Sequence, residues 1–169
     1  VYENFDWKEK FTTIIKALDK FYYDVIVTAP GFEKNSKKNI FFIKKHLKNK
    51  KKFKFVESLG FKNYFSLLNK SKFVIGNSSS GIIEVPYFRI PTINIGERQK
   101  GRFMHKSIIN TDFKLNNIVK AINKCENKKF IIKIKNMKLK FGNGNTSAKI
   151  VKTVEKKLFN KDLLIKEIN

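Results

Sequence analysis

The sequence contains one cysteine, Cys125, and three prolines in 169 residues. A single thiol excludes an internal disulfide and is typical of a reducing cytoplasm, which is where we expect the protein to act. No run of eighteen apolar residues occurs, so no membrane span is expected, and the first ten residues lack the apolar segment of a secretory leader. Because linkers and internal repeats are also missing, the sequence predicts a single domain over residues 1–169.

Arginine is scarce as well, and it occurs only at Arg89, Arg98 and Arg102. The formal net charge of +23 therefore comes from lysine, which is spread along the chain and is densest over residues 34–54. Proteins that read nucleic acids use arginine and aromatic platforms, so specific nucleic-acid binding is not expected. A basic module for nucleic acid or an anionic surface stays open as an alternative. No set of His, Cys, Asp and Glu has metal-ligand spacing, and we expect neither a metal nor a cofactor.

Apolar residues follow a helical period and a strand period in alternation along the chain. The expected helices span 7–22, 36–48, 64–69, 81–88, 115–125 and 145–158, and the expected strands span 25–29, 53–57, 73–75, 92–95 and 107–110. Residues 128–141 have no clear period and are left unassigned. The alternation predicts an α/β fold, a Rossmann-like parallel sheet with helices on both faces.

The segment over residues 73–102 is the most informative part of the chain. An apolar strand ends at Gly76, and five small or polar residues, from Asn77 to Gly81, come before the next helix. A second strand then ends in a loop that contains Arg98. Open α/β sheets bind ligands at turns off the carboxyl ends of their strands, so we expect a binding site here.

The residue types in this turn predict binding of a nucleotide diphosphate. Free N–H groups at a helix start, with the hydroxyls of Ser78, Ser79 and Ser80, can donate to phosphate oxygens. Glu84 lies one helical turn after Ser80, where its carboxylate can accept the two hydroxyls of a ribose. The planar fork of Arg98 suits phosphate oxygens. The alternative is an ordinary polar turn with a serine N-cap.

This block resembles the nucleotide-binding signature of the hydrolysing UDP-N-acetylglucosamine 2-epimerases, in the branch that feeds sialic acid and related nonulosonic acids. The family reads Gly-Asn-Ser-Ser-small-Gly, then Glu, then Pro-x-x-Asn-(Ile/Leu)-Gly-x-Arg-Gln-x-Gly-Arg, and residues 91–102 match the last part without a gap. The non-hydrolysing branch would show Ser-Gly-Gly and a glutamate pair, which this chain lacks. Weaker similarity at 29–32 and 142–145 extends along almost the whole chain, although Gly31 stands where the family commonly has asparagine.

The resemblance implies a GT-B-type fold of two Rossmann-like halves, of which this chain is similar to the nucleotide-binding C-terminal half. The catalytic N-terminal domain, a partner of this half, is then expected to be absent from the chain, so no catalytic residue is assigned here. By family pattern, the backbone near Leu59 and the ring of Tyr64 contact the base. Residues 77–81, here called the serine turn, contact the rest of UDP or a UDP-N-acetylhexosamine together with Glu84 and Arg98.

The implied activity of the parent enzyme is elimination of UDP followed by hydration, which yields N-acetylmannosamine or a related 2-epimerised hexosamine. The chain alone is then expected to be inactive. Uracil or guanine as the base, the identity of the hexosamine and assembly as a homo-oligomer are left open. A glycosyltransferase of the same two-domain fold is a further alternative, disfavoured by the Arg-Gln-x-Gly-Arg string at residues 98–102.

Overall fold

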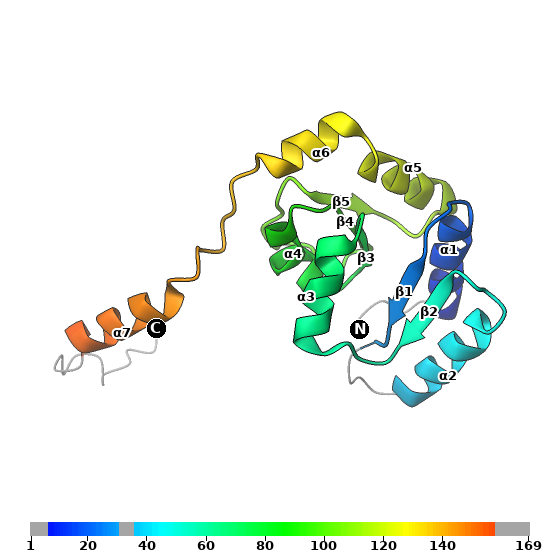
Figure 1. The fold of residues 1–169 in the computed structure, drawn as a ribbon, viewed down its shortest axis with the longest axis horizontal. Helices are drawn as coiled ribbons and strands as arrows, with labels where there is room; N and C mark the ends of the chain where they lie inside the picture. The colour runs from blue at the N-terminus through cyan, green and yellow to red at the C-terminus, as the bar shows by residue number, and fades with distance from the viewer. Residues whose placement is uncertain (1–6, 31–35, 158–169) are drawn as a thin grey trace, which may run out of the picture. The chain divides into compact units, whose positions relative to one another are not determined.

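The computed structural model describes residues 7–30 and 36–157, which form alternating helices and strands (Figure 1). In chain order the elements are α1 (Trp7–Asp19), β1 (Val25–Thr28), α2 (Ser36–Leu47), β2 (Phe53–Val56), α3 (Gly60–Lys70), β3 (Val74–Gly76), α4 (Ser80–Ile83), the 3-10 helix η1 (Val85–Phe88), β4 (Thr92–Ile95), β5 (Ile108–Thr111), α5 (Leu115–Cys125), α6 (Lys128–Lys135) and α7 (Thr146–Lys157). This order confirms the α/β fold that the sequence predicts. Gly31 and the predicted helix end at Leu158 lie outside the described residues.

The strands pair in parallel throughout the described chain. One sheet joins β1 to β2, and the other has the order β3-β4-β5. In the second sheet Gly76 lies opposite Asn94, which lies opposite Asn110. Because parallel strands end at a common edge, the loops after β3 and β4 leave the sheet side by side.

The central strand β4 is buried on both faces, as expected of a strand between two helical layers. Ile93 packs in the hydrophobic core with Ile15 of α1 and Ile118 of α5. Thr92 points to the other face, where its Oγ1 donates to the Gly81 carbonyl oxygen of α4 at 2.9 Å. Helices therefore cover both faces of this sheet (Figure 1).

The helix predicted over 81–88 is wrong in its extent. The chain forms only four residues of α-helix in α4 and then changes to the 3-10 helix η1. Pro86 explains the change, because it has no N–H to continue the α-helical hydrogen bonds. Arg89 then ends η1 in the left-handed conformation, with φ 57°.

Helix α6 lies within the segment that the sequence pattern leaves unassigned. Asn127 caps it, and its side-chain oxygen accepts the Phe130 N–H at 3.0 Å. Ile134 is fully buried, whereas Ile132 is exposed. Alternating lysine and isoleucine resembles a strand pattern, and the Asn127 cap was the available signal for a helix.

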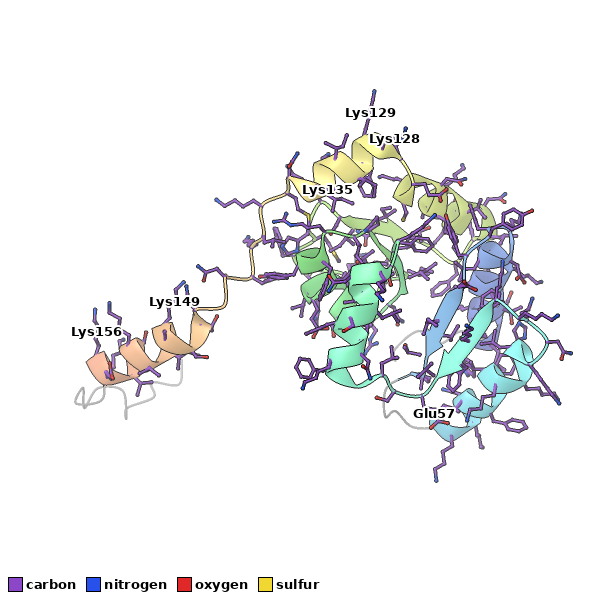
Figure 2. The ribbon with its side chains drawn as sticks, in the orientation of Figure 1. Glu57, Lys128, Lys129, Lys135, Lys149 and Lys156 are labelled. Carbon is purple, nitrogen blue, oxygen red and sulfur yellow. The ribbon has the colours of Figure 1, made fainter. Side chains whose placement is uncertain are left out.

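Part of the lysine-rich segment over residues 34–54 has a structural role. Lys50 forms an ion pair with Asp19, and Lys52 Nζ lies 3.5 Å from the same carboxylate. Lys52 also donates to the Phe21 carbonyl oxygen at 2.7 Å, so this loop is tied to the end of α1. The lysines of α6 and α7 are exposed; Figure 2 shows Lys128, Lys129 and Lys135 on α6 and Lys149 and Lys156 on α7.

The chain divides into two compact units, residues 1–137 and residues 138–169. In the second unit, α7 has an apolar stripe of Ile150, Val151 and Val154, each more than half exposed. In the first unit, Cys125 is buried at the end of α5, where it packs in the hydrophobic core. Over the described residues, none of the helices has the length and apolar character needed to cross a membrane.

Candidate functional site

The predicted turn occupies the carboxyl edge of the β3-β4-β5 sheet. Asn77, Ser78 and Ser79 follow the last residue of β3, and Ser80 begins α4. Gly81 lets this helix approach β4 closely, because an added Cβ would lie 2.8 Å from the Thr92 Cγ2 atom. The side chains of Ser78 and Ser79 are exposed at this edge. Any ligand at this edge would therefore meet their hydroxyls.

Three side chains form a hydrogen-bonded chain beside the turn. Ser80 Oγ donates to Glu84 Oε2 at 2.5 Å, and Tyr64 Oη lies 2.6 Å from Ser80 Oγ. Ser80 has one hydroxyl proton, which it donates to Glu84, so Tyr64 must be the donor to Ser80. The contact between Ser80 and Glu84 is the one that their four-residue spacing predicts. A carboxylate held through one oxygen keeps further acceptor positions for a ligand.

The backbone of the turn differs from the expectation of free N–H groups at a helix start. The Ser80 N–H donates to Ser78 Oγ at 3.3 Å, and the Gly81 N–H donates to the Ser78 carbonyl oxygen at 3.2 Å. The Ile82 N–H donates to the Ser79 carbonyl oxygen at 3.0 Å. These three donors are satisfied within the turn, so the serine hydroxyls are the better candidates for contact with an anion.

Arg98 lies on the loop over residues 96–102, which follows β4. Gly96 and Gly101 have φ angles of 78° and 82°, a region that favours glycine. The Arg98 side chain is exposed, whereas Gln99 is only 2% exposed. Gln99 Nε2 donates to the Asn77 carbonyl oxygen at 2.7 Å, which joins this loop to the serine turn. Sequence reasoning missed this link, although Gln99 stands inside the matched signature.

The two residues assigned to the base lie at the start of α3. Leu59 is half-buried at the N-cap position, and Gly60 begins the helix with φ 60°. The Tyr64 ring is half-buried and tilts against Phe65, with ring centroids 5.8 Å apart. Burial raises the pKa of the Tyr64 phenol, which keeps it a donor. Its hydroxyl connects α3 to the serine turn, a contact that the sequence does not predict.

Two other polar residues, Asn94 of β4 and His105 before β5, are buried. Asn94 Nδ2 donates to Asn110 Oδ1 at 2.8 Å across the ends of β4 and β5. His105 is 3% exposed, and burial lowers its pKa, so its imidazole is neutral near pH 7. No group of three or more His, Cys, Asp or Glu side chains that could hold a metal ion occurs within 7–30 and 36–157.

The parallel sheets, the helices on both faces and the small-residue turn after β3 define a Rossmann-like α/β domain. Residues 2–155 match the family model described as UDP-N-acetylglucosamine 2-epimerase. The match covers most of the chain, and the chain belongs to this family.

Curated relatives match over part of their length. A GDP/UDP-N,N'-diacetylbacillosamine 2-epimerase (hydrolyzing) of Campylobacter jejuni is 48% identical over 83 residues, 49% of this chain and 21% of the relative. The polysialic acid biosynthesis protein P7 of Escherichia coli is 45% identical over 80 residues, 47% of this chain and 20% of the relative. The matched segment is therefore about a fifth of each of these relatives.

A solved structure has the same fold as this chain. The crystal structure of the Methanocaldococcus jannaschii UDP-GlcNAc 2-epimerase, in complex with UDP-GlcNAc and UDP, has a TM-score of 0.68 and 22% sequence identity. The match covers 88% of this chain and 41% of that chain. At this identity it shows a shared fold.

Proposed function

We propose that this chain is the nucleotide-binding, C-terminal half of a hydrolysing UDP-N-acetylglucosamine 2-epimerase. The whole enzyme would release UDP together with N-acetylmannosamine or a related 2-epimerised hexosamine. Family membership supports the epimerase, and the name of the Campylobacter jejuni relative supports the hydrolysing branch. That name contains both GDP and UDP, so the base stays open between guanine and uracil.

The observation that carries the proposal is the chain from Tyr64 through Ser80 to Glu84, beside two exposed serines. Glu84 Oε2 is held by Ser80, and the carboxylate can still accept hydroxyls of a ribose. Ser78 and Ser79 are placed one turn earlier, where their hydroxyls can donate to the diphosphate. This separation keeps the carboxylate away from the phosphate charge while both bind one nucleotide.

The proposed role in the reaction is stabilisation of the leaving group. Negative charge develops on UDP as the bond from the sugar to the diphosphate breaks. Donors fixed in advance around that charge, here Ser78, Ser79 and Arg98, stabilise the transition state. Leu59 and Tyr64 would contact the base, and Asn77 and Gly81 would shape the turn. The reacting sugar would meet catalytic groups outside this chain, so the chain would bind its ligand without turnover.

A thermal-shift screen of the 169-residue chain with UDP, UDP-GlcNAc, GDP and CMP tests the proposal. A ligand at 100 times its Kd stabilises a protein by about 2.7 kcal/mol, which corresponds to roughly 5–10 °C in Tm for a domain of this size. We expect this shift with UDP or GDP, and a smaller one in Ser79→Ala. Ser66→Ala is the matched control, because Ser66 Oγ donates only to the Lys62 carbonyl oxygen of its own helix, at 2.9 Å. No shift with any of the four ligands would refute the proposal.

A further inference from the structure

We infer that Gln99 is a positioning residue that holds the Arg98 loop against the serine turn and so sets the geometry for the diphosphate. The inference rests on the proposed function. Gln99 is the one buried residue of the loop over residues 96–102, and the other residues from 97 to 102 are exposed. The loop contains two turns, in which the Lys100 N–H donates to the Glu97 carbonyl oxygen at 2.9 Å and the Arg102 N–H donates to the Gln99 carbonyl oxygen at 3.3 Å. These bonds lie within the loop, whereas the Gln99 side chain joins the loop to the serine turn.

The orientation of the Gln99 amide follows from its partner. The acceptor is the Asn77 backbone carbonyl oxygen, 2.7 Å away, and only the amide nitrogen can donate to it. Asn77 immediately precedes Ser78, so the bond joins the two segments that carry the proposed phosphate donors. Arg98 is the neighbour of Gln99 in the chain. A shift of the loop would therefore change where the Arg98 guanidinium lies relative to the serine hydroxyls.

The burial of Gln99 is better explained by this tether than by packing. Its Oε1 atom is buried and has no hydrogen-bond partner within the described chain, which is unfavourable for a buried amide. An apolar side chain of similar volume would fill the same space without that unsatisfied oxygen. Asn77 is half-buried, so water could satisfy its carbonyl oxygen if the amide were replaced. Gln99→Met should therefore keep the fold and lose the tether.

The experiment compares the parent chain, Gln99→Met and Ser71→Ala for binding of UDP and of uridine by NMR titration, with the Tm of each. Ser71→Ala is the matched control, since Ser71 Oγ also donates to one backbone carbonyl oxygen, that of Leu67 at 2.8 Å, before β3 at the opposite end of the strand. For Gln99→Met we expect a Kd for UDP raised roughly three- to tenfold, the effect of one ordinary hydrogen bond. We expect its Kd for uridine to stay within about twofold of the parent value, and its Tm to stay within about 4 °C.

Two further measurements separate the tether from its alternatives. In an Arg98→Ala background, Gln99→Met should change the Kd for UDP by less than about twofold, because the group that it positions is gone. In the protein without ligand, amide hydrogen exchange over residues 77–81 should be faster in Gln99→Met than in the parent.

Several results would overturn the inference. Unchanged UDP binding in Gln99→Met, or unchanged amide exchange, would show that the tether is dispensable. Equal losses for UDP and uridine with a large fall in Tm would show a purely structural role. If the parent chain binds uridine and UDP equally, the serine turn does not hold a diphosphate. If it binds neither, the proposed function itself fails, and the Gln99 inference fails with it.

Discussion

Replacing Glu84 should remove the preference of the protein for a ribose over a deoxyribose. In the structure Glu84 Oε2 is 2.5 Å from Ser80 Oγ, so the carboxylate is fixed by α4 before any ligand arrives. A hydrogen bond to a charged group contributes about 1.5–3 kcal/mol, or roughly 10- to 100-fold in Kd. The parent chain should therefore bind UDP at least about tenfold more tightly than 2′-deoxy-UDP, if the carboxylate accepts the 2′-hydroxyl.

The assay is calorimetric titration of both ligands into the parent chain, Glu84→Ala and Tyr64→Phe. In Glu84→Ala the two Kd values should become equal to within about threefold, since the acceptor is lost. Tyr64→Phe is the control for the hydrogen-bonded chain: it removes the donor to Ser80 Oγ, leaves the carboxylate in place and should keep most of the preference. A Glu84→Ala protein that binds UDP and 2′-deoxy-UDP in the parent ratio would refute the assignment of Glu84 to the ribose.

Three other outcomes are expected. Gly81→Ala should destabilise the fold by about 1–3 kcal/mol in urea unfolding, because its Cβ would lie 2.8 Å from Thr92 Cγ2; an unchanged midpoint would contradict the close packing of α4 on β4. Burial lowers the pKa of His105, although a backbone hydrogen bond with Ile82 opposes this shift. Because the unfolded chain then binds the proton more tightly than the folded protein, the free energy of unfolding should fall as the pH drops below about 6.5. A His105→Gln protein should lose that part of the pH dependence, and an identical pH profile would exclude His105 as its source. The chain alone should release no free hexosamine from UDP-GlcNAc in a coupled assay, and release above a Glu84→Ala control would show that it carries its own catalytic groups.

The elements with a strong apolar period were predicted well from the sequence. Helix α5 has the predicted bounds, 115–125, because its apolar residues fall on one face and Ile118 and Ile122 are fully buried. Strand β4 also has its predicted bounds. The errors lie where local chemistry outweighs the period. Pro86 divides the predicted helix into α4 and η1, and α6 forms from an alternating segment because tertiary packing buries Ile134.

In the candidate site, the sequence predicts only the contact between residues that are close along the chain. The spacing of Ser80 and Glu84 predicts their contact, because residues four apart share a helix face. The bonds from Tyr64 to Ser80 and from Gln99 to Asn77 join residues 16 and 22 positions apart, and no sequence period connects them. Both depend on the parallel sheet, which places the loops after β3 and β4 at one edge. The fold therefore adds the links that hold the predicted residues together.

A calorimetric titration of UDP into the 169-residue chain, at low and at raised salt, tests the proposed diphosphate site most directly. A site that holds one diphosphate through Ser78, Ser79 and Arg98 should show one-to-one binding, with a small slope of log Kd against log salt concentration. A surface that binds polyanions through the net charge of +23 would instead lose affinity steeply. On duplex DNA, log K falls by about 0.9 per phosphate neutralised for each tenfold rise in salt concentration. We expect saturable one-to-one binding of UDP that persists in raised salt. Absence of UDP binding, or binding that disappears with salt and is shared equally by inorganic polyphosphate, would contradict it.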